Sequence, residues 1–257
     1  MAKFISIANQ KGGVGKTTTA MNLGVALKQS GKRVLLIDFD TQANLSEYLG
    51  FKNDNEITTI SDLMMSEINY QETNVEESIQ YSEVNDIDYI PSDLNLATVE
   101  NYLSGTFSKE TVLKRIIGDN EIINAYDYVF IDCPPTLAIL LINALTLCDG
   151  VIIPVQAQMF AYEAIDKLYE ILKKVKMVLN PNIKVVGILP TMVNTTKVSK
   201  EVIQLLNNNY SQDLFNTVIP ASTEASKSAR NKRSLCLDTS KLGNAYKELA
   251  KELINKE

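Results

Sequence analysis

Apolar residues follow two patterns along this chain. Some gather in short continuous runs, which are typical of buried strands. Between these runs, apolar residues recur every three or four positions, which is typical of helices that bury one face. Strands that are apolar on both faces and are connected by helices predict an α/β fold, with a mostly parallel twisted sheet flanked by helices on both faces. The runs rich in Ile and Val predict seven strands, at residues 4–9, 33–38, 87–91, 128–132, 150–155, 184–189 and 215–219.

Three helices are predicted most clearly, each by an apolar stripe on one face. The first should end at Gly31, because glycine commonly terminates helices. The stripes consist of Ala20, Leu23, Gly24 and Leu27 in the first helix, of Ala161, Ala164, Ile165, Leu168, Leu172, Val175 and Leu179 in the second, and of Leu242, Ala245, Leu249 and Leu253 in the third.

The length of 257 residues, 45% of them hydrophobic, fits a single domain spanning 1–257 that buries a full core without disulfides or metals. Residues 51–86 are acidic, rich in Asn and weakly periodic, so we predict a peripheral insertion with short helices there. No secretory signal precedes the first predicted strand, and no apolar run approaches the roughly 20 residues that span a bilayer. We therefore expect a cytoplasmic protein.

Charge and cysteine usage narrow the possible functions. The net charge is −6, but residues 51–100 contribute −11, which leaves +5 for the rest of the chain and permits a local basic face. The three cysteines, Cys133, Cys148 and Cys236, are widely spaced, and histidine is absent. These features predict neither a zinc site nor a disulfide framework, and they exclude a histidine base.

The stretch KGGVGKTTTA, residues 11–20, lies between the first predicted strand and the first predicted helix. Its glycines let the backbone N–H groups surround a compact anion, while a lysine and a threonine serve the phosphates and Mg²⁺. We predict a variant phosphate-binding loop, with Gln10 at the first glycine of the usual pattern; a glycine-rich turn without a ligand is the alternative. The predicted nucleotide-binding residues are Gly12, Gly13, Val14, Gly15, Lys16, Thr17 and Thr18.

Acidic residues at strand ends offer ligands for the metal that such a loop requires. Asp132 ends a buried apolar strand, and Mg²⁺ favours a nearby carboxylate. Asp38 and Asp40 follow another strand, two positions apart. Asp40 is better placed to orient an attacking water, whereas Asp38 fits a strand-terminating role equally well. The metal-binding candidates are therefore Thr17, Asp40 and Asp132.

Four blocks in combination resemble the ParA/Soj family of DNA-partitioning ATPases, within the deviant-Walker-A group that also contains MinD and the nitrogenase iron protein. They are NQKGGVGKTTTAMNLGVAL, VLLIDFDTQANLS, VFIDCPP and GVIIPVQAQMFAYEAI, and the resemblance runs from about residue 2 to 250. It implies a P-loop NTPase fold, with ATP and Mg²⁺ as cofactors and a homodimer in the ATP-bound state. Thr41, where the family usually has proline, is a mild departure.

The resemblance also implies catalytic roles for Lys11, Lys16 and Asp40. In the family, the lysine that Lys11 matches reaches across an ATP-bound dimer to the partner's nucleotide. A cation supplied in trans raises the rate of phosphoryl transfer by about 10³–10⁵ in other NTPases. Asp40 matches the aspartate linked to hydrolysis, and Asp132 matches the second-motif aspartate. A solvated loop lysine is the alternative for Lys11.

The block GILPTMVNTTKVSKEV matches the region where the family holds adenine and begins a DNA-facing helix. Asn194 stands where the family often has aspartate, and its amide can still bond a base edge. Met192 and Pro220 would flank the ring, unless they are ordinary core or turn residues.

Non-specific DNA binding requires several basic residues on one surface. The segment ASKSARNKRS contains four bases and no acid, and two more lysines follow Asn194 at helical spacing. A solvated charge run is the alternative on charge alone, but both segments match the DNA-contacting region of the family. The predicted DNA-binding residues are Lys197, Lys200, Lys227, Arg230, Lys232 and Arg233.

Three other functions fit the sequence less well. A MinD-like membrane ATPase needs a C-terminal helix with a basic polar face, but the tail mixes lysine and glutamate. An iron–sulfur reductase component needs exposed cysteines, and a binding module without turnover would not need Lys11, Lys16 and Asp40. We therefore expect a weak ATPase that binds DNA non-specifically and associates with the nucleoid and not with a membrane. It should partition a plasmid or chromosome together with a ParB-type centromere-binding partner, which stimulates hydrolysis.

Overall fold

The computed structural model describes residues 1–53, 57–158 and 161–256, except for the side chain of Ala161. The predicted place of Ala161 in the second stripe, Met159 and Phe160 of the block GVIIPVQAQMFAYEAI, and residues 54–56 of the acidic segment therefore lie outside the described residues.

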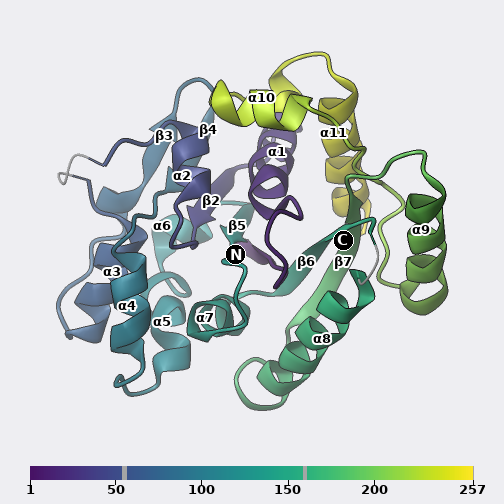
Figure 1. Ribbon diagram of the computed structural model, residues 1–257. Coiled ribbons are helices and arrows are strands. Elements are labelled where there is room, and N and C mark those ends of the chain that lie inside the picture. The colour runs from purple at the N-terminus through teal and green to yellow at the C-terminus, as the bar shows by residue number, and fades with distance from the viewer. Residues whose placement is uncertain (54–56, 159–160, 257) are drawn as a thin grey trace.

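The described strands form one sheet in the order β3-β4-β2-β5-β1-β6-β7 (Figure 1). All neighbouring pairs are parallel except β3 and β4, which are antiparallel. The predicted α/β fold with a mostly parallel sheet is confirmed. The strands are β1 (Lys3–Ile7), β2 (Val34–Asp38), β3 (Gln80–Ser82), β4 (Ile87–Ile90), β5 (Tyr128–Asp132), β6 (Gly150–Gln156) and β7 (Lys184–Thr191).

Helices cover both faces of the sheet because its strands are apolar on both sides. In β2, Leu35 and Ile37 pack into the core beneath α3, α4, α5, α7 and α8, while Val34 and Leu36 pack into the core beneath α1 and α11. The helices are α1 (Lys16–Gln29), α2 (Asn44–Leu49), α3 (Ile60–Ile68), α4 (Leu96–Leu103), α5 (Val112–Ile117), α6 (Glu121–Asn124), α7 (Ile139–Leu147), α8 (Ala161–Val178), α9 (Lys197–Tyr210), α10 (Glu224–Arg230) and α11 (Lys241–Asn255), with 3-10 turns η1 (Glu76–Ser78), η2 (Lys109–Thr111) and η3 (Leu235–Leu237).

The predicted strand at 215–219 is wrong. The N–H groups of Phe215 and Ile219 bond to β7, but the bridges in this region are isolated ones at Leu214 and Pro220, on either side of the segment. The backbone N–H groups of Asn216 and Thr217 are instead bound by the Glu252 carboxylate of α11, at 2.7 and 2.9 Å. A strand ladder therefore cannot form there, because these donors are already used.

The acidic segment contributes one strand that the hydrophobic pattern missed. β3 is three residues long and polar, and it lies at the edge of the sheet, where a strand needs little apolar surface. Upstream of it, Ile60, Leu63 and Met64 of α3 are buried in the core. A capping box between Thr59 and Asp62 begins α3.

The C-terminal helix α11 packs on α1, the helix that follows the glycine-rich loop. Leu242, Leu249 and Leu253 of the predicted stripe are buried, and Tyr246 joins them. The apolar face of α11 is thus part of the core. Among the described helices, none is long and apolar enough to cross a bilayer.

Replacing Leu249 with alanine should lower the free energy of unfolding by about 2–5 kcal/mol, because the side chain is fully buried. Urea denaturation followed by circular dichroism measures this change. Lys251→Ala is the control on the same helix, since this lysine is exposed and forms an ion pair with the exposed Glu248. Equal stability of the two variants would contradict the packing of α11 on the core.

Candidate nucleotide site

The candidate site lies at the carboxyl ends of three adjacent strands, β2, β5 and β1. In the parallel register, Asp132 at the end of β5 is opposite both Ile7 of β1 and Asp38 of β2. The sequence runs from β1 into the glycine-rich loop and then into α1. The register therefore brings the loop and the strand-end aspartates to one edge of the sheet, where open α/β sheets bind ligands.

The glycine-rich loop turns in a way that requires glycine at two positions. Gly13 and Gly15 have φ angles of 72° and 90°, in the left-handed region that other residues rarely adopt. The Val14 side chain between them is buried, and its carbonyl accepts a 2.9 Å hydrogen bond from the Thr191 hydroxyl at the end of β7. The loop is thus held from a strand 177 positions away in the sequence.

A second contact shapes the entry to the loop. The Asn9 side chain donates a 2.8 Å hydrogen bond to the Pro154 carbonyl of β6 and accepts a 2.9 Å bond from the Lys11 backbone N–H. The Lys11 side chain itself is exposed to solvent. Neither Asn9 nor Thr191 belongs to the glycine-lysine pattern, although Asn9 directly precedes it, so no sequence motif indicated these two contacts.

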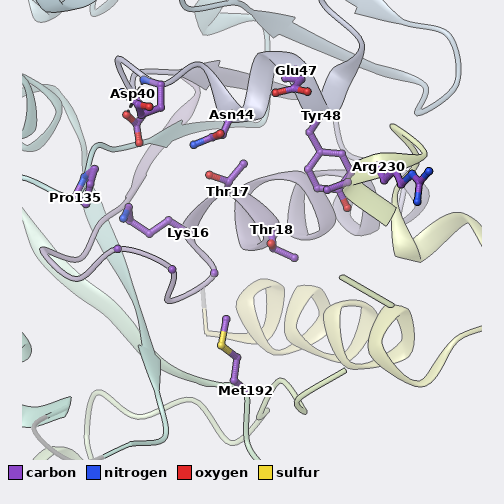
Figure 2. Close-up of a pocket in the computed structure, with 15 residues that line it drawn as sticks. Lys16, Thr17, Thr18, Asp40, Asn44, Glu47, Tyr48, Pro135, Met192 and Arg230 are labelled. Carbon is purple, nitrogen blue, oxygen red and sulfur yellow. Dashed lines mark hydrogen bonds between the residues drawn. The ribbon is translucent and has the colours of Figure 1, made fainter. Parts of the chain in front are cut away.

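A cavity of about 510 Å³ opens beside the loop. Figure 2 shows Lys16 and Thr17 at its centre, with Asp40 and Asn44 on one side and Met192 on the other. The predicted residues Gly12, Gly13, Gly15 and Thr18 also line it, whereas Val14 does not. Six further lining residues were not predicted from the sequence: Gln42, Asn44, Glu47, Tyr48, Pro135 and Ala229.

Asp132 is a buried carboxylate without a hydrogen bond in the described chain. It is 1% exposed, and neither of its oxygens has a partner within residues 1–53, 57–158 and 161–256. Burial and the neighbouring Asp38 raise its pKa well above the usual range, while Thr17 and Lys16 oppose that rise. An unpartnered buried carboxylate beside a lysine and a threonine hydroxyl fits a divalent cation, which would supply the missing charge.

Asp38 differs from Asp132 in that the protein satisfies it. Its Oδ2 accepts bonds of 2.7 Å from both the backbone N–H and the hydroxyl of Ser46, and its Oδ1 accepts a 3.2 Å bond from the Asp40 N–H. Burial raises its pKa to about 6. Of the two interpretations of Asp38, the structural one is thus supported: this side chain anchors the turn that carries Asp40.

Asp40 lines the cavity and is held by its neighbours. Its Oδ1 accepts a 3.0 Å bond from the Gln42 N–H, and its carbonyl accepts a 2.9 Å bond from the Ser92 hydroxyl. The Ser92 N–H in turn donates to the Ser46 hydroxyl at 2.8 Å. The segment after β4 therefore fixes the Asp40 turn, a role that no motif in the sequence indicated.

A second cavity, of about 580 Å³, shares Gly15, Thr18 and Met192 with the first. Met192, Asn194 and Pro220, which were predicted to hold the base, all line it. Two backbone hydrogen bonds of Val193, to Ile219 and from Ala221, hold the two lining loops together. Asn194 Oδ1 accepts a 3.0 Å bond from the Thr196 N–H, so its amide nitrogen is the atom left to face a base.

The predicted DNA-binding residues fall into two groups. Lys227 and Arg230 lie on α10, with Lys232 and Arg233 directly after it. Lys197 and Lys200 lie on α9, which Figure 1 places on the other side of α11. Lys197 and Arg233 each have an acidic partner, Glu201 at 3.7 Å and Asp238 at 3.4 Å. Arg230 also lines the first cavity, beside the glycine-rich loop.

The cysteines take no part in this site. Cys133, Cys148 and Cys236 are all free and buried, so none is exposed as an iron–sulfur reductase component would need. Within the described residues, no cluster of three or more His, Cys, Asp or Glu side chains is arranged to hold a metal.

A family model described as an AAA domain matches residues 2–185. The sporulation initiation inhibitor protein Soj of Bacillus subtilis is 37% identical to this chain over 256 residues, covering 98% of each chain. The chromosome partitioning protein ParA of Caulobacter vibrioides is 36% identical over 258 residues, covering 99% of this chain and 95% of the relative.

Solved structures give the same picture. A putative plasmid partition protein of Borrelia burgdorferi bound to AMPPNP superposes with a TM-score of 0.82 at 27% identity, covering 100% of both chains. Cobyrinic acid a,c-diamide synthase of Mycobacterium smegmatis, with an ATP analogue and magnesium, gives a TM-score of 0.85 at 28% identity, covering 99% of this chain and 95% of that one.

Replacing Thr191 with valine should loosen the glycine-rich loop, because the Val14 carbonyl loses its buried partner. We expect the free energy of unfolding to fall by about 1–3 kcal/mol and the backbone amides of residues 12–15 to exchange faster, as hydrogen exchange with mass spectrometry can measure. Thr191→Ser keeps the hydroxyl and should behave like the wild type. Identical exchange in the valine variant would show that the loop does not depend on this bond.

Proposed function

Because this chain belongs to the ParA/Soj family of DNA-partitioning ATPases, we propose that it binds ATP with Mg²⁺, dimerises around the nucleotide, binds duplex DNA non-specifically and hydrolyses ATP slowly. The observation that carries the proposal is the unpartnered, buried Asp132 carboxylate beside Lys16 and Thr17. A site of this kind needs a cation and an anion together, which is what Mg²⁺-ATP provides.

The residues present fit Mg²⁺ and a triphosphate. The backbone N–H groups of residues 12–18 and the Lys16 ammonium would hold the phosphates, at the N-terminus of α1. The Thr17 hydroxyl and Asp132 would hold the metal, with Asp40 near it. When bound, Mg²⁺ neutralises charge on the phosphates. Met192 and Pro220 would flank the base, with the Asn194 amide at its edge.

Hydrolysis is assigned to Asp40. Its carboxylate faces the cavity of about 510 Å³ beside the glycine-rich loop, which we call the phosphate cavity. Its turn is fixed by Asp38 and Ser92. A carboxylate held in this way can orient a water for attack on the terminal phosphate. Slow hydrolysis by such an enzyme makes ATP a timer that limits how long the bound state persists.

Dimerisation is assigned to Lys11. Its backbone N–H bonds to the Asn9 side chain, and the residue is exposed to solvent at the start of the loop. A lysine in this position can neutralise the transferring phosphoryl group in a second copy. ATP binding and pairing would then be one event, because each site is complete only when two chains meet.

The basic residues of α9, of α10 and of the segment directly after α10 would contact DNA phosphates, so that the ATP-bound dimer associates with the nucleoid. We propose that a ParB-type centromere-binding partner stimulates hydrolysis and releases the dimer, which moves a plasmid or chromosome. A MinD-like membrane function is the rival proposal. It is disfavoured because α11 buries its apolar face against α1 and has no free face to insert into lipid.

The Asp40→Ala variant should bind ATP as the wild type does and hydrolyse it at least about 10²-fold more slowly, because the water loses its orienting carboxylate. Lys16→Ala is the companion variant, which should lose nucleotide binding altogether. Fluorescent-nucleotide titration and a phosphate-release assay separate the two effects. Normal hydrolysis by Asp40→Ala would refute the role given to this residue.

Replacing Arg230, Lys232 and Arg233 together with alanine should weaken duplex binding at least tenfold and flatten its dependence on salt, since fewer counterions are released. The matched control replaces three exposed lysines of α8, Lys173, Lys174 and Lys176. Co-sedimentation with DNA, with and without ATP, measures the effect, and anionic vesicles in place of DNA test the membrane rival. Unchanged duplex binding by the Arg230, Lys232 and Arg233 variant would place the DNA-binding face elsewhere.

A further inference from the structure

A chain of buried hydrogen bonds connects α1 to the basic segment, residues 227–233. The Asn22 amide of α1 lies 3.5 Å from the Tyr48 hydroxyl of α2. The Tyr48 hydroxyl contacts the Ser228 hydroxyl of α10, and the Ser228 hydroxyl donates to the backbone carbonyl of Arg233. Three helices that are distant in sequence are thus joined by uncharged side chains.

The direction of this chain follows from the number of protons. A hydroxyl has one proton to donate, and Ser228 gives its proton to the Arg233 carbonyl. Tyr48 must therefore donate to Ser228, and Asn22 must donate to Tyr48. Burial raises the pKa of Tyr48, so its hydroxyl stays protonated at neutral pH. Asn22, Tyr48 and Ser228 are at most 7% exposed, so water competes little for these bonds.

Further hydrogen bonds from uncharged side chains hold the backbone of the basic segment and the two residues after it. Asn22 Oδ1 accepts bonds of 2.8 Å from the Ser234 hydroxyl and the Leu235 N–H. Asn85 accepts a 2.8 Å bond from the Ser234 N–H and donates a 3.1 Å bond to the Lys232 carbonyl. The backbone is therefore fixed from within, while the side chains of Lys227, Arg230 and Arg233 remain exposed.

The hydrogen-bond series also reaches the phosphate cavity, through Tyr48 and Asn22. Tyr48 and Arg230 both line that cavity, and Figure 2 shows them side by side. Asn22 also donates a 2.8 Å bond to the carbonyl of Thr18, a residue that lines both cavities. The helix α2, which carries Tyr48, begins four residues after Asp40. A ligand in the cavity thus shares its walls with the side chains that place the basic segment.

We propose that Tyr48 is a positioning residue through which occupancy of the phosphate cavity sets the position of the basic segment. The inference rests on the proposed function of that cavity as an ATP site. Coupling of this kind is reciprocal, so a ligand held by the basic segment changes nucleotide affinity by the same factor. Tyr48 then links the two activities of the molecule without itself acting on ATP or on DNA.

The test compares hydrogen exchange of the amides of residues 228–235 with and without a non-hydrolysable ATP analogue and Mg²⁺, at saturation for each protein. We expect nucleotide to slow exchange in the wild type. In Tyr48→Phe and in Ser228→Ala, this nucleotide-dependent change should shrink about fivefold, the factor that one net hydrogen bond commands. In the double variant, the nucleotide-dependent change should shrink no further than in either single variant, because both substitutions break the same series of hydrogen bonds.

Tyr169→Phe is the matched control, since its hydroxyl donates a 2.6 Å bond to Asp213 and it lines neither cavity. It should keep the full nucleotide-dependent change.

A purely structural role for Tyr48 would lower the melting temperature and leave the nucleotide dependence intact, and that result would overturn the inference. A wild type that fails to bind DNA but shows the exchange change refutes the proposed function alone. Variants that bind DNA with unaltered dependence on ATP refute the inference alone.

Discussion

Two carboxylates buried side by side, Asp38 and Asp132, are the constraint on which the site depends. The parallel register of β2 and β5 places them opposite each other, each about 1% exposed. Two like charges in a low-dielectric interior repel strongly, and burial disfavours both. The protein compensates Asp38 with donors from Ser46 and the Asp40 backbone. It leaves Asp132 without a hydrogen-bonded partner in the described chain, where Lys16 and Thr17 are the neighbours that favour its charged form.

Hydrogen bonds hold each of the segments that surround the two carboxylates. Asp38 holds the turn of Asp40 and the start of α2, Ser92 joins that turn to the end of β4, and Thr191 holds the glycine-rich loop from β7. Each tie comes from a different strand end. The cavity beside the glycine-rich loop is thus bordered by segments that are held from three different strand ends.

The helix α1 connects the cavity with two other parts of the molecule. Its first turn follows the glycine-rich loop, its middle holds Ser234 and Leu235, just after the basic segment, through Asn22, and its buried side packs on α11. The same helix therefore contributes to ligand binding, to the placement of a charged surface and to stability. Because α11 is used for packing, its amphipathic pattern in the sequence reflects the core of the protein and not a membrane surface.

The sequence by itself determined the parts whose physical cause is local. Gly13, Gly15, Lys16 and Thr17 are contiguous, and Asp132 directly ends a run of apolar residues, so their pattern alone indicated a phosphate loop and a strand-end acid. Six of the seven predicted strands formed because their apolar residues had two helical layers to pack against. The strand at 215–219 did not, since its donors are taken by Glu252, a residue whose proximity no local pattern records.

Tertiary structure alone decided which polar side chains support the site. Thr191, Ser92, Asn22 and Tyr48 are ordinary residues in the sequence, and they gain roles because the sheet order brings together segments that are up to 214 positions apart. A hydrogen bond depends on distance and direction between two atoms, and a one-dimensional pattern specifies neither for residues that are far apart in the chain.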